Sequence, residues 1–174
     1  MSTNKPTLST TLTDIRHDAR RYGPGWLRRT GFLVVLSYRV RRLRKYGGWA
    51  YLLLLPLDVL LGMARNAVSD TTIPSCVPVG EGLYLPHPNG IIVNHQTRIG
   101  SDVSIFQQVT IGEWHGKAPV IGNGCSLFAG AKIFGGISIG SDSKVGANVV
   151  LNNDLPNNAS ASVGEPVIRI RKSN

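Results

Sequence analysis

The chain has 174 residues, of which 42% are hydrophobic and 17% charged, and this composition suits one folded domain with an extension and excludes a disordered protein. Its 20 glycines follow no Gly-X-Y period, which excludes collagen. Its two cysteines, Cys76 and Cys125, have no zinc-finger spacing, and we expect neither a structural zinc nor a disulfide framework in a chain of the reducing cytosol.

The net charge of +9 is concentrated in the first part of the chain. Residues 1–70 hold 12 Lys and Arg against 4 Asp and Glu, a net of +8, whereas residues 71–174 hold 7 against 6, a net of +1. Such a basic segment is typical of proteins that bind nucleic acid or an anionic membrane. No DNA- or RNA-binding motif is present, and the arginines alternate with Leu and Tyr, so we expect no nucleic-acid partner.

Three helices are predicted in residues 1–70. The first ten residues are polar and are expected to be frayed, with no signal peptide. A short helix follows over residues 13–23, and an amphipathic helix over 31–48 carries apolar side chains at helical spacing. A more apolar helix is expected over 49–68.

Three interpretations of residues 49–68 are open. The helix packs as a core helix on the rest of the protein, spans a membrane, or forms with its neighbour a pair lying on an anionic membrane, with arginines on the head groups. The apolar run from Trp49 to Met63 is shorter than the about 20 residues of a span and contains Asp58, so the core helix is favoured.

From residue 71 onward, aliphatic residues recur with a period of six. This period fits a solenoid in which each six residues form one short strand and a tight turn, and it predicts a parallel β-helix over 71–174. The thirteen positions are Ile73, Val79, Leu85, Val93, Ile99, Ile105, Ile111, Ile121, Leu127, Ile133, Ile139, Val145 and Leu151.

The period breaks twice, and both breaks contain a histidine. Two extra residues separate Leu85 from Val93, around His87, and four extra residues separate Ile111 from Ile121. An insertion in a solenoid has to leave the coil as a loop, and such loops commonly carry function. The second loop contains Trp114, His115 and Lys117, and His95 lies close to the first.

Four stretches resemble the hexapeptide-repeat acyltransferases, in particular their serine O-acetyltransferase branch. They are residues 83–93, 101–112, 129–140 and 144–156, and the chain continues with a similar stretch over 163–171. The resemblance covers about 100 residues and extends weakly into the helices, at SYRVRRL (37–43). It implies a left-handed parallel β-helix, homotrimers with sites between neighbouring chains, and acetyl transfer from acetyl-CoA to a hydroxyl.

The resemblance implies that His87 is the catalytic base. An imidazole within hydrogen-bond reach takes the hydroxyl proton during attack on the thioester, which is typically worth about 10²–10⁴ in rate. The family's acidic neighbour of this histidine is replaced by Pro86, its glutamate eight residues later by His95, and the acidic residue that orients the base by Thr72. Asp70 is a candidate substitute for that orienting acid.

These departures affect the acceptor. The shortened second loop offers His115 and Lys117, with Trp114, in place of the family's Arg-His pair. We therefore expect a sugar or polysaccharide hydroxyl as the acceptor, with serine as the alternative. The substrate-binding residues predicted on this basis are Asp70, Thr72, His95, Trp114, His115 and Lys117.

On the acetyl-CoA side the match is better. Small residues at Ala129, Gly130 and Ala147 would let the pantetheine arm approach the coil backbone, and Lys132, Lys144, Arg169 and Arg171 are candidates for the CoA phosphates.

Two other functions are weighed. A gamma-class carbonic anhydrase would need three zinc-binding histidines, and the spacing of His87, His95 and His115 does not match that family, so no metal is expected. A non-catalytic scaffold is the second. We expect a cytoplasmic enzyme, with the basic helices as a candidate contact to the inner face of the membrane.

Overall fold

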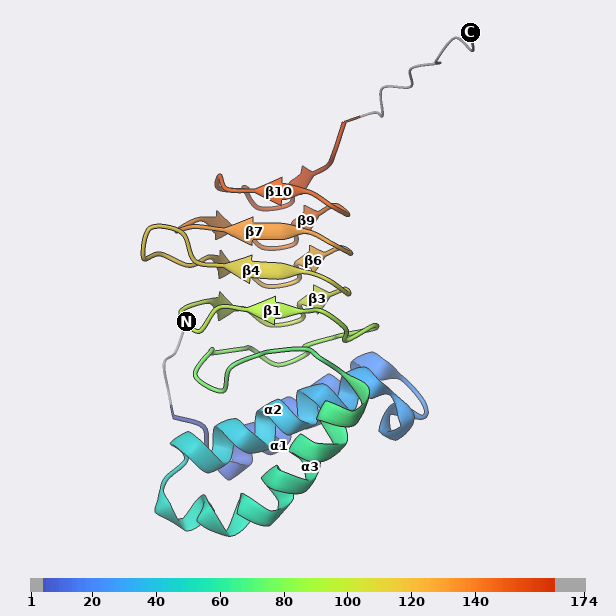
Figure 1. Cartoon of the computed structure of the whole chain (residues 1–174), viewed down its shortest axis with the longest axis vertical. Coiled ribbons are helices and arrows are strands. Elements are labelled where there is room, and N and C mark those ends of the chain that lie inside the picture. Colours follow the sequence, from blue (N-terminus) through green and yellow to red (C-terminus); the bar gives the residue numbers. More distant parts are fainter. Residues whose placement is uncertain (1–4, 165–174) are drawn as a thin grey trace, which may run out of the picture.

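The computed structural model describes residues 5–164 and places the helices at one end of a stack of β-coils (Figure 1). The helices are α1 (Leu8–Tyr22), the 3₁₀ helix η1 (Trp26–Arg28), α2 (Thr30–Tyr46), the 3₁₀ helix η2 (Trp49–Leu54) and α3 (Leu55–Val68). The three predicted helices are thus confirmed. Pro56 lies in the first turn of α3, the position that proline tolerates, and the residues before it form the 3₁₀ turns of η2.

The start of α1 differs from the expectation that the first ten residues are frayed. The helix begins at Leu8 because Thr7 and Thr10 form a capping box, in which each side chain bonds the other residue's backbone N–H. Such a box satisfies two of the N–H groups that a helix start leaves without partners.

Eleven short strands follow and pair in parallel. They are β1 (Ile92–Val93), β2 (Arg98–Ile99), β3 (Ser104–Ile105), β4 (Thr110–Gly112), β5 (Val120–Ile121), β6 (Ser126–Leu127), β7 (Lys132–Phe134), β8 (Ser138–Ile139), β9 (Lys144–Val145), β10 (Val150–Leu151) and β11 (Ser160–Ala161). The first face of the resulting prism is β1-β4-β7-β10, the second is β2-β5-β8, and the third is β3-β6-β9-β11. The predicted parallel β-helix is confirmed.

The period of six generates the core. Twelve of the thirteen predicted aliphatic side chains are buried, and Leu151, near the open end of the stack, is partly buried. A second set of inward-facing residues lies two positions earlier in each repeat and includes Ile91, Val103, Val109 and Cys125. The two sets form one continuous apolar column through the stack.

The extra residues leave the coils at two different edges of the prism. We call the turns from the third face to the first the His87 edge. They are residues 86–90, 106–109, 128–131 and 146–149. The turns from the first face to the second, which include residues 94–97 and 113–118, are called the loop edge. Residues 113–118 form the loop that projects from the coils between β4 and β5 (Figure 1).

A buried arginine joins the helices to the first coil. The Arg39 guanidinium donates to both carboxylate oxygens of Asp18, at 2.9 and 3.1 Å, and to the carbonyls of Val79 and Gly80, at 2.9 and 2.6 Å. Asp18 also accepts the Leu83 N–H at 2.9 Å. Burial lowers the pKa of Arg39, but the charge and hydrogen bonds of Asp18 outweigh it and raise that pKa overall.

The other arginines of the basic run are also engaged within the protein. Arg41 and Arg44 donate to the two oxygens of buried Asp58, at 3.0 and 2.7 Å, and thereby hold α3 against α2. Arg42 donates to the Ser75 carbonyl at 2.8 Å. The expectation that this run lies on membrane head groups is therefore corrected, because folding uses these guanidiniums to bind carboxylates and carbonyls.

The core-helix interpretation of residues 49–68 holds only in part, because the segment packs on α2 but is mostly exposed. Only Asp58 and Gly62 are buried in α3, whereas Trp49 is 86% and Leu53 88% exposed. The segment Tyr51–Val68 is long and apolar enough to cross a membrane by length and composition alone, and 11% of it is buried. Its least exposed residues include Leu54, Asp58, Leu61, Gly62 and Arg65, and it leaves an apolar face uncovered.

Candidate active site

His87 lies in the loop of residues 86–90, at the end of the His87 edge nearest the helices. Its side chain is exposed and lines a cavity of about 440 Å³ between the helical segment and the first coils. Its backbone carbonyl accepts the Asn89 N–H at 2.8 Å. Within residues 5–164 the imidazole has no hydrogen-bond partner, so both ring nitrogens are available to a substrate.

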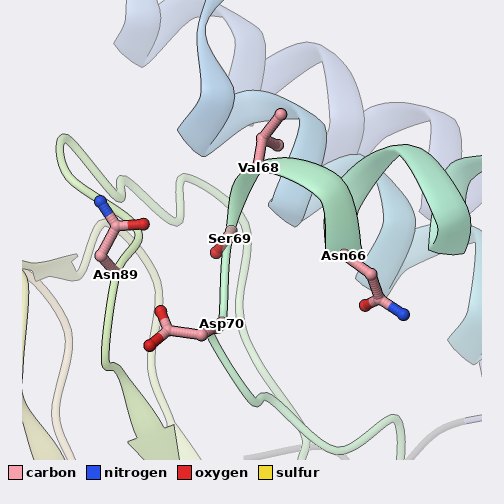
Figure 2. Close-up of a pocket in the computed structure, with 5 residues that line it drawn as sticks. All are labelled: Asn66, Val68, Ser69, Asp70 and Asn89. Atoms are coloured by element: carbon pink, nitrogen blue, oxygen red, sulfur yellow. The ribbon is translucent and has the colours of Figure 1, made fainter.

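The part of the loop that follows His87 is held by the junction after α3. The Ser69 hydroxyl donates to the Pro88 carbonyl, and Asp70 Oδ1 accepts the Gly90 N–H at 2.6 Å. Figure 2 shows both side chains beside the segment that carries Asn89. Asp70 therefore fixes the backbone after His87, and within residues 5–164 it forms no hydrogen bond to the ring, so its role as the orienting acid stays a prediction.

Two residues of the helical segment fix Leu85, two positions before His87. The buried Leu85 N–H donates to the Tyr22 phenol oxygen at 2.9 Å. Gly31 approaches the same residue so closely that a Cβ there would lie 1.8 Å from the Leu85 carbonyl oxygen. Burial raises the pKa of Tyr22 well above its usual range, so the phenol stays neutral near neutral pH.

The candidate acetyl-CoA residues extend along the same edge. Its turns are joined by backbone hydrogen bonds, from the Gln108 N–H to the Asn89 carbonyl, from the Gly130 N–H to the Gln107 carbonyl, and from the Asn148 N–H to the Ala129 carbonyl, at 2.8–3.0 Å. Ala129, Gly130 and Ala147 thus continue the line that starts at His87. A line of small side chains lets a ligand approach the backbone.

The candidate phosphate-binding cations are only partly located. The Lys132 ammonium donates to the Gln108 carbonyl at 2.7 Å, beside the His87 edge, and Lys144 is exposed on β9. Arg169 and Arg171 lie outside the described residues.

The remaining predicted substrate-binding residues lie elsewhere. His95 is exposed in the turn of residues 94–97, and the projecting loop contains Trp114, His115 and Lys117. Backbone bonds of 2.9 and 3.2 Å between Trp114 and Lys117 close this loop, and His115 at its tip has a φ of 52°. All four belong to the loop edge.

The structure therefore divides the predicted site between two edges. The first face of the prism separates His87 from the loop edge within one chain. Thr72 is exposed and pairs with Ile92 at the lower end of that face. A site that uses both edges has to combine one chain's His87 with another chain's loop.

No group of three or more His, Cys, Asp or Glu within residues 5–164 is arranged to hold a metal ion. Other functional candidates were missed by sequence reasoning. Tyr22, Arg28, Arg29, Tyr84 and Asn89 line the cavity beside His87. Only the positive charge of the two arginines was visible in the sequence, because the helix turn and the first coil meet without any repeating pattern.

Comparison with known proteins supports the resemblance. The chain is 41% identical over 116 residues to a serine acetyltransferase of Helicobacter pylori, which covers 64% of this chain and 67% of that protein. The chain spans from about half to two thirds of the curated relatives it matches first. No family model matches.

Solved structures agree with this relationship. A serine acetyltransferase in complex with CoA superposes with a TM-score of 0.70 at 29% identity, covering 88% of this chain and 67% of that one. The Neisseria gonorrhoeae serine acetyltransferase in complex with serine gives 0.72 at 27% identity, covering 91% and 68%.

Proposed function

Since the chain belongs to the serine acetyltransferase family and shares its left-handed β-helix, we propose that it transfers acetyl from acetyl-CoA to the hydroxyl of serine, with His87 as general base. Its enzyme class is that of the acetyl-CoA-dependent O-acetyltransferases. The observation that carries the proposal is the exposed imidazole of His87 at a cavity, at the start of the edge that carries Ala129, Gly130 and Ala147.

The chemistry needs one base and one oxyanion stabiliser. An imidazole nitrogen of His87 takes the hydroxyl proton while the oxygen attacks the thioester carbonyl of acetyl-CoA. Backbone N–H groups of the coils hold the resulting oxyanion. The intermediate then expels the CoA thiolate, which takes the proton from the imidazolium, so that the products are the O-acetyl ester and CoA.

Serine is the acceptor that the relatives favour, since a solved neighbour at 27% identity is in complex with serine. A sugar hydroxyl is the second candidate, favoured by the uncharged residues Pro86 and Thr72 where the resemblance places acids. Loss of those acids removes partners for the serine ammonium. Because the relatives favour serine, the sugar hydroxyl expected from the sequence becomes the second candidate acceptor.

Acetyl-CoA binding is proposed along the His87 edge. Ala129, Gly130 and Ala147 leave room for the pantetheine arm, and Lys132 lies beside the same turns to meet a phosphate. Lys144 and the two C-terminal arginines, Arg169 and Arg171, remain proposed phosphate contacts. This arrangement places the thioester at the His87 end of the line.

A homotrimer is proposed because the predicted site is divided between two edges. Three prisms packed side by side would bring His87 of one chain to Trp114, His115 and Lys117 of the next, with His95 close by. Supporting this arrangement, the projecting loop extends away from its own coil (Figure 1).

We propose that the reaction takes place in the cytoplasm, with the uncovered apolar face of η2 and α3 as the candidate contact to its membrane. Trp49, Leu52, Leu53 and Leu60 supply that face. Flotation of the intact protein with anionic vesicles tests this contact, and protein that stays at the bottom of the gradient excludes it.

The experiment for the main proposal measures free thiol released from acetyl-CoA with a panel of acceptors. L-serine, glucose, galactose and N-acetylglucosamine are compared at equal concentrations. We expect thiol release with L-serine and the O-acetylserine product in mass spectrometry. Thiol release with a sugar and none with serine would contradict serine as the acceptor but would support the transferase. If no acceptor of the panel caused thiol release, both claims would be contradicted.

A further inference from the structure

The cavity beside His87 is positively charged on one wall. The η1–α2 turn contributes Arg28 and Arg29 to it, and the first coils contribute Tyr84 and His87. No Asp or Glu is among its lining residues, which are Tyr22, Arg28, Arg29, Thr30, Gly31, Val68, Tyr84, Pro86, His87, Pro88 and Asn89.

The two arginines are free to bind a ligand. Both are exposed, and within residues 5–164 neither guanidinium forms a salt bridge or a hydrogen bond. Arg39, Arg41 and Arg44 of the following helix are by contrast all paired with aspartates. A guanidinium binds planar oxyanions through paired N–H donors, so two of them at one cavity form a receptor for a phosphate or a carboxylate.

The place of these arginines relative to His87 is fixed by packing. Gly31, two residues after Arg29, lies directly against the Leu85 carbonyl, and Leu85 in turn is two residues before His87. The first turn of α2 also borders the cavity and has no side-chain cap, so the positive end of the helix dipole adds to the same potential.

The Asp70 carboxylate lines an adjoining pocket, which shares Val68 and Asn89 with the cavity at His87. Asp70 lines an open hollow with Asn66, Val68, Ser69 and Asn89, and one of its oxygens already accepts the Gly90 N–H (Figure 2). A free ammonium group in the cavity at His87 would therefore face two guanidiniums and no Asp or Glu of the cavity's own lining, which costs free energy.

We propose that the acceptor carries an oxyanion, phosphate or carboxylate, beside its reactive hydroxyl, and that Arg28 and Arg29 bind this group while His87 takes the proton. The inference rests on the proposed acetyl transfer and specifies its substrate class. Phosphorylated or acidic sugars meet this requirement for an oxyanion fully. Serine satisfies it through its carboxylate only, since its ammonium finds no acid in the cavity.

The first test measures binding rather than activity. Inorganic pyrophosphate is titrated into the protein by calorimetry with CoA present at saturation, so that the CoA phosphate contacts are already occupied. The double variant Arg28→Gln/Arg29→Gln is compared with Arg16→Gln/Arg20→Gln, which removes the same charge from exposed α1 positions beside a different pocket.

We expect the unmodified protein to bind pyrophosphate, the Arg28/Arg29 variant to bind it about tenfold more weakly or worse, and the α1 variant to change by less than about twofold. Absent binding to the unmodified protein, or equal weakening in both double variants, would overturn the proposal, because the effect would then be one of overall charge.

The second test separates the two sources of the oxyanion. Thiol release from acetyl-CoA is measured with glucose, glucose 1-phosphate, glucuronate and L-serine. The proposal expects a higher kcat/KM for the anionic sugars than for glucose, and a rise in KM for anionic acceptors alone in Arg28→Gln/Arg29→Gln. Equal rates for glucose and its anionic forms would sink this inference and leave acetyl transfer standing, whereas inactivity with every acceptor would count against the proposed function itself.

Discussion

At the scale of single residues, Leu85 connects the helical segment to the proposed base. Its N–H is bound by Tyr22 and its carbonyl is covered by Gly31, so the chain enters the loop of residues 86–90 in one fixed direction. Ser69 and Asp70 fix the exit from the loop. His87 therefore takes its position from backbone anchors on both sides, although no carboxylate of residues 5–164 bonds its ring.

Replacing Tyr22 by phenylalanine tests this anchoring. Tyr22→Phe leaves the buried Leu85 N–H without an acceptor, and we expect a loss of about 1–3 kcal/mol in the free energy of unfolding, measured by urea denaturation. Tyr46→Phe is the matched control, because its hydroxyl forms no hydrogen bond within residues 5–164 and the substitution is expected to change stability by less than about 0.5 kcal/mol. Equal effects of the two substitutions would show that the Leu85 bond contributes nothing.

Alkaline pH is a second test at this scale. Burial raises the pKa values of Tyr22 and Tyr38 above 10, and the Tyr38 hydroxyl donates to the Val77 carbonyl at 2.6 Å. Since the folded chain retains these protons longer, their contribution to stability is complete below pH 10 and is lost as the pH rises towards the folded pKa. Above pH 10, we expect each of the two tyrosines to lower the unfolding free energy by about 1.4 kcal/mol for every further pH unit.

Urea denaturation of the unmodified chain and of Tyr38→Phe at pH 8, 10 and 11 measures this slope. The variant lacks one of the two groups and is expected to lose stability less steeply. Parallel slopes would mean that Tyr38 does not contribute to the alkaline loss.

At the scale of elements, the arginines of α2 show what the sequence could and could not reveal. Their number and amphipathic spacing predict the helix correctly but are also compatible with contacts to an anionic surface. The structure pairs Arg39 with Asp18 and Arg41 with Asp58, partners 21 and 17 residues away. Because such partners follow no local period, sequence alone could not distinguish an internal clamp from a surface patch.

The Arg39 clamp gives a prediction about the joint between helices and coils. Arg39→Met would leave the fully buried Asp18 without its counter-ion, and we expect a loss of about 3–5 kcal/mol in unfolding free energy. Arg20→Met, at an exposed position of α1, is expected to cost less than about 0.5 kcal/mol. Chemical denaturation followed by circular dichroism measures both, and a change below 1 kcal/mol in Arg39→Met would refute the clamp.

At the scale of the whole molecule, the repeat predicted most of the fold. The thirteen aliphatic positions define the three faces, because a period of six repeats the same inward direction on each face. The inward residues two positions earlier were missed since they include Thr97, Cys125 and Ser143, which do not read as a hydrophobic set. The position of the His87 edge can be predicted by counting hexapeptides in the sequence. The cavity that Arg28 and Arg29 line could not be predicted, because it depends on how the helices pack on the first coils.

The division of the site between two edges predicts complementation between chains. His87→Asn and the double variant Trp114→Ala/His115→Ala are co-expressed with different tags and purified through both. Each variant alone is expected to be nearly inactive, and the mixed trimers are expected to recover about a third of the unmodified activity, because one of the three sites in each has both parts intact. No recovery in oligomers shown to contain both chains would place the whole site within one chain.

The most direct measurement of the central claim is the steady-state rate of thiol release from acetyl-CoA by His87→Asn with the best acceptor. The account predicts a fall of about 10²–10⁴ in kcat, with little change in the KM for acetyl-CoA and an unchanged melting temperature. Gln96→Ala, an exposed substitution on the loop edge, is the control and is expected to retain full activity. A His87→Asn protein that folds and keeps a kcat within about twofold of the unmodified enzyme would contradict the account.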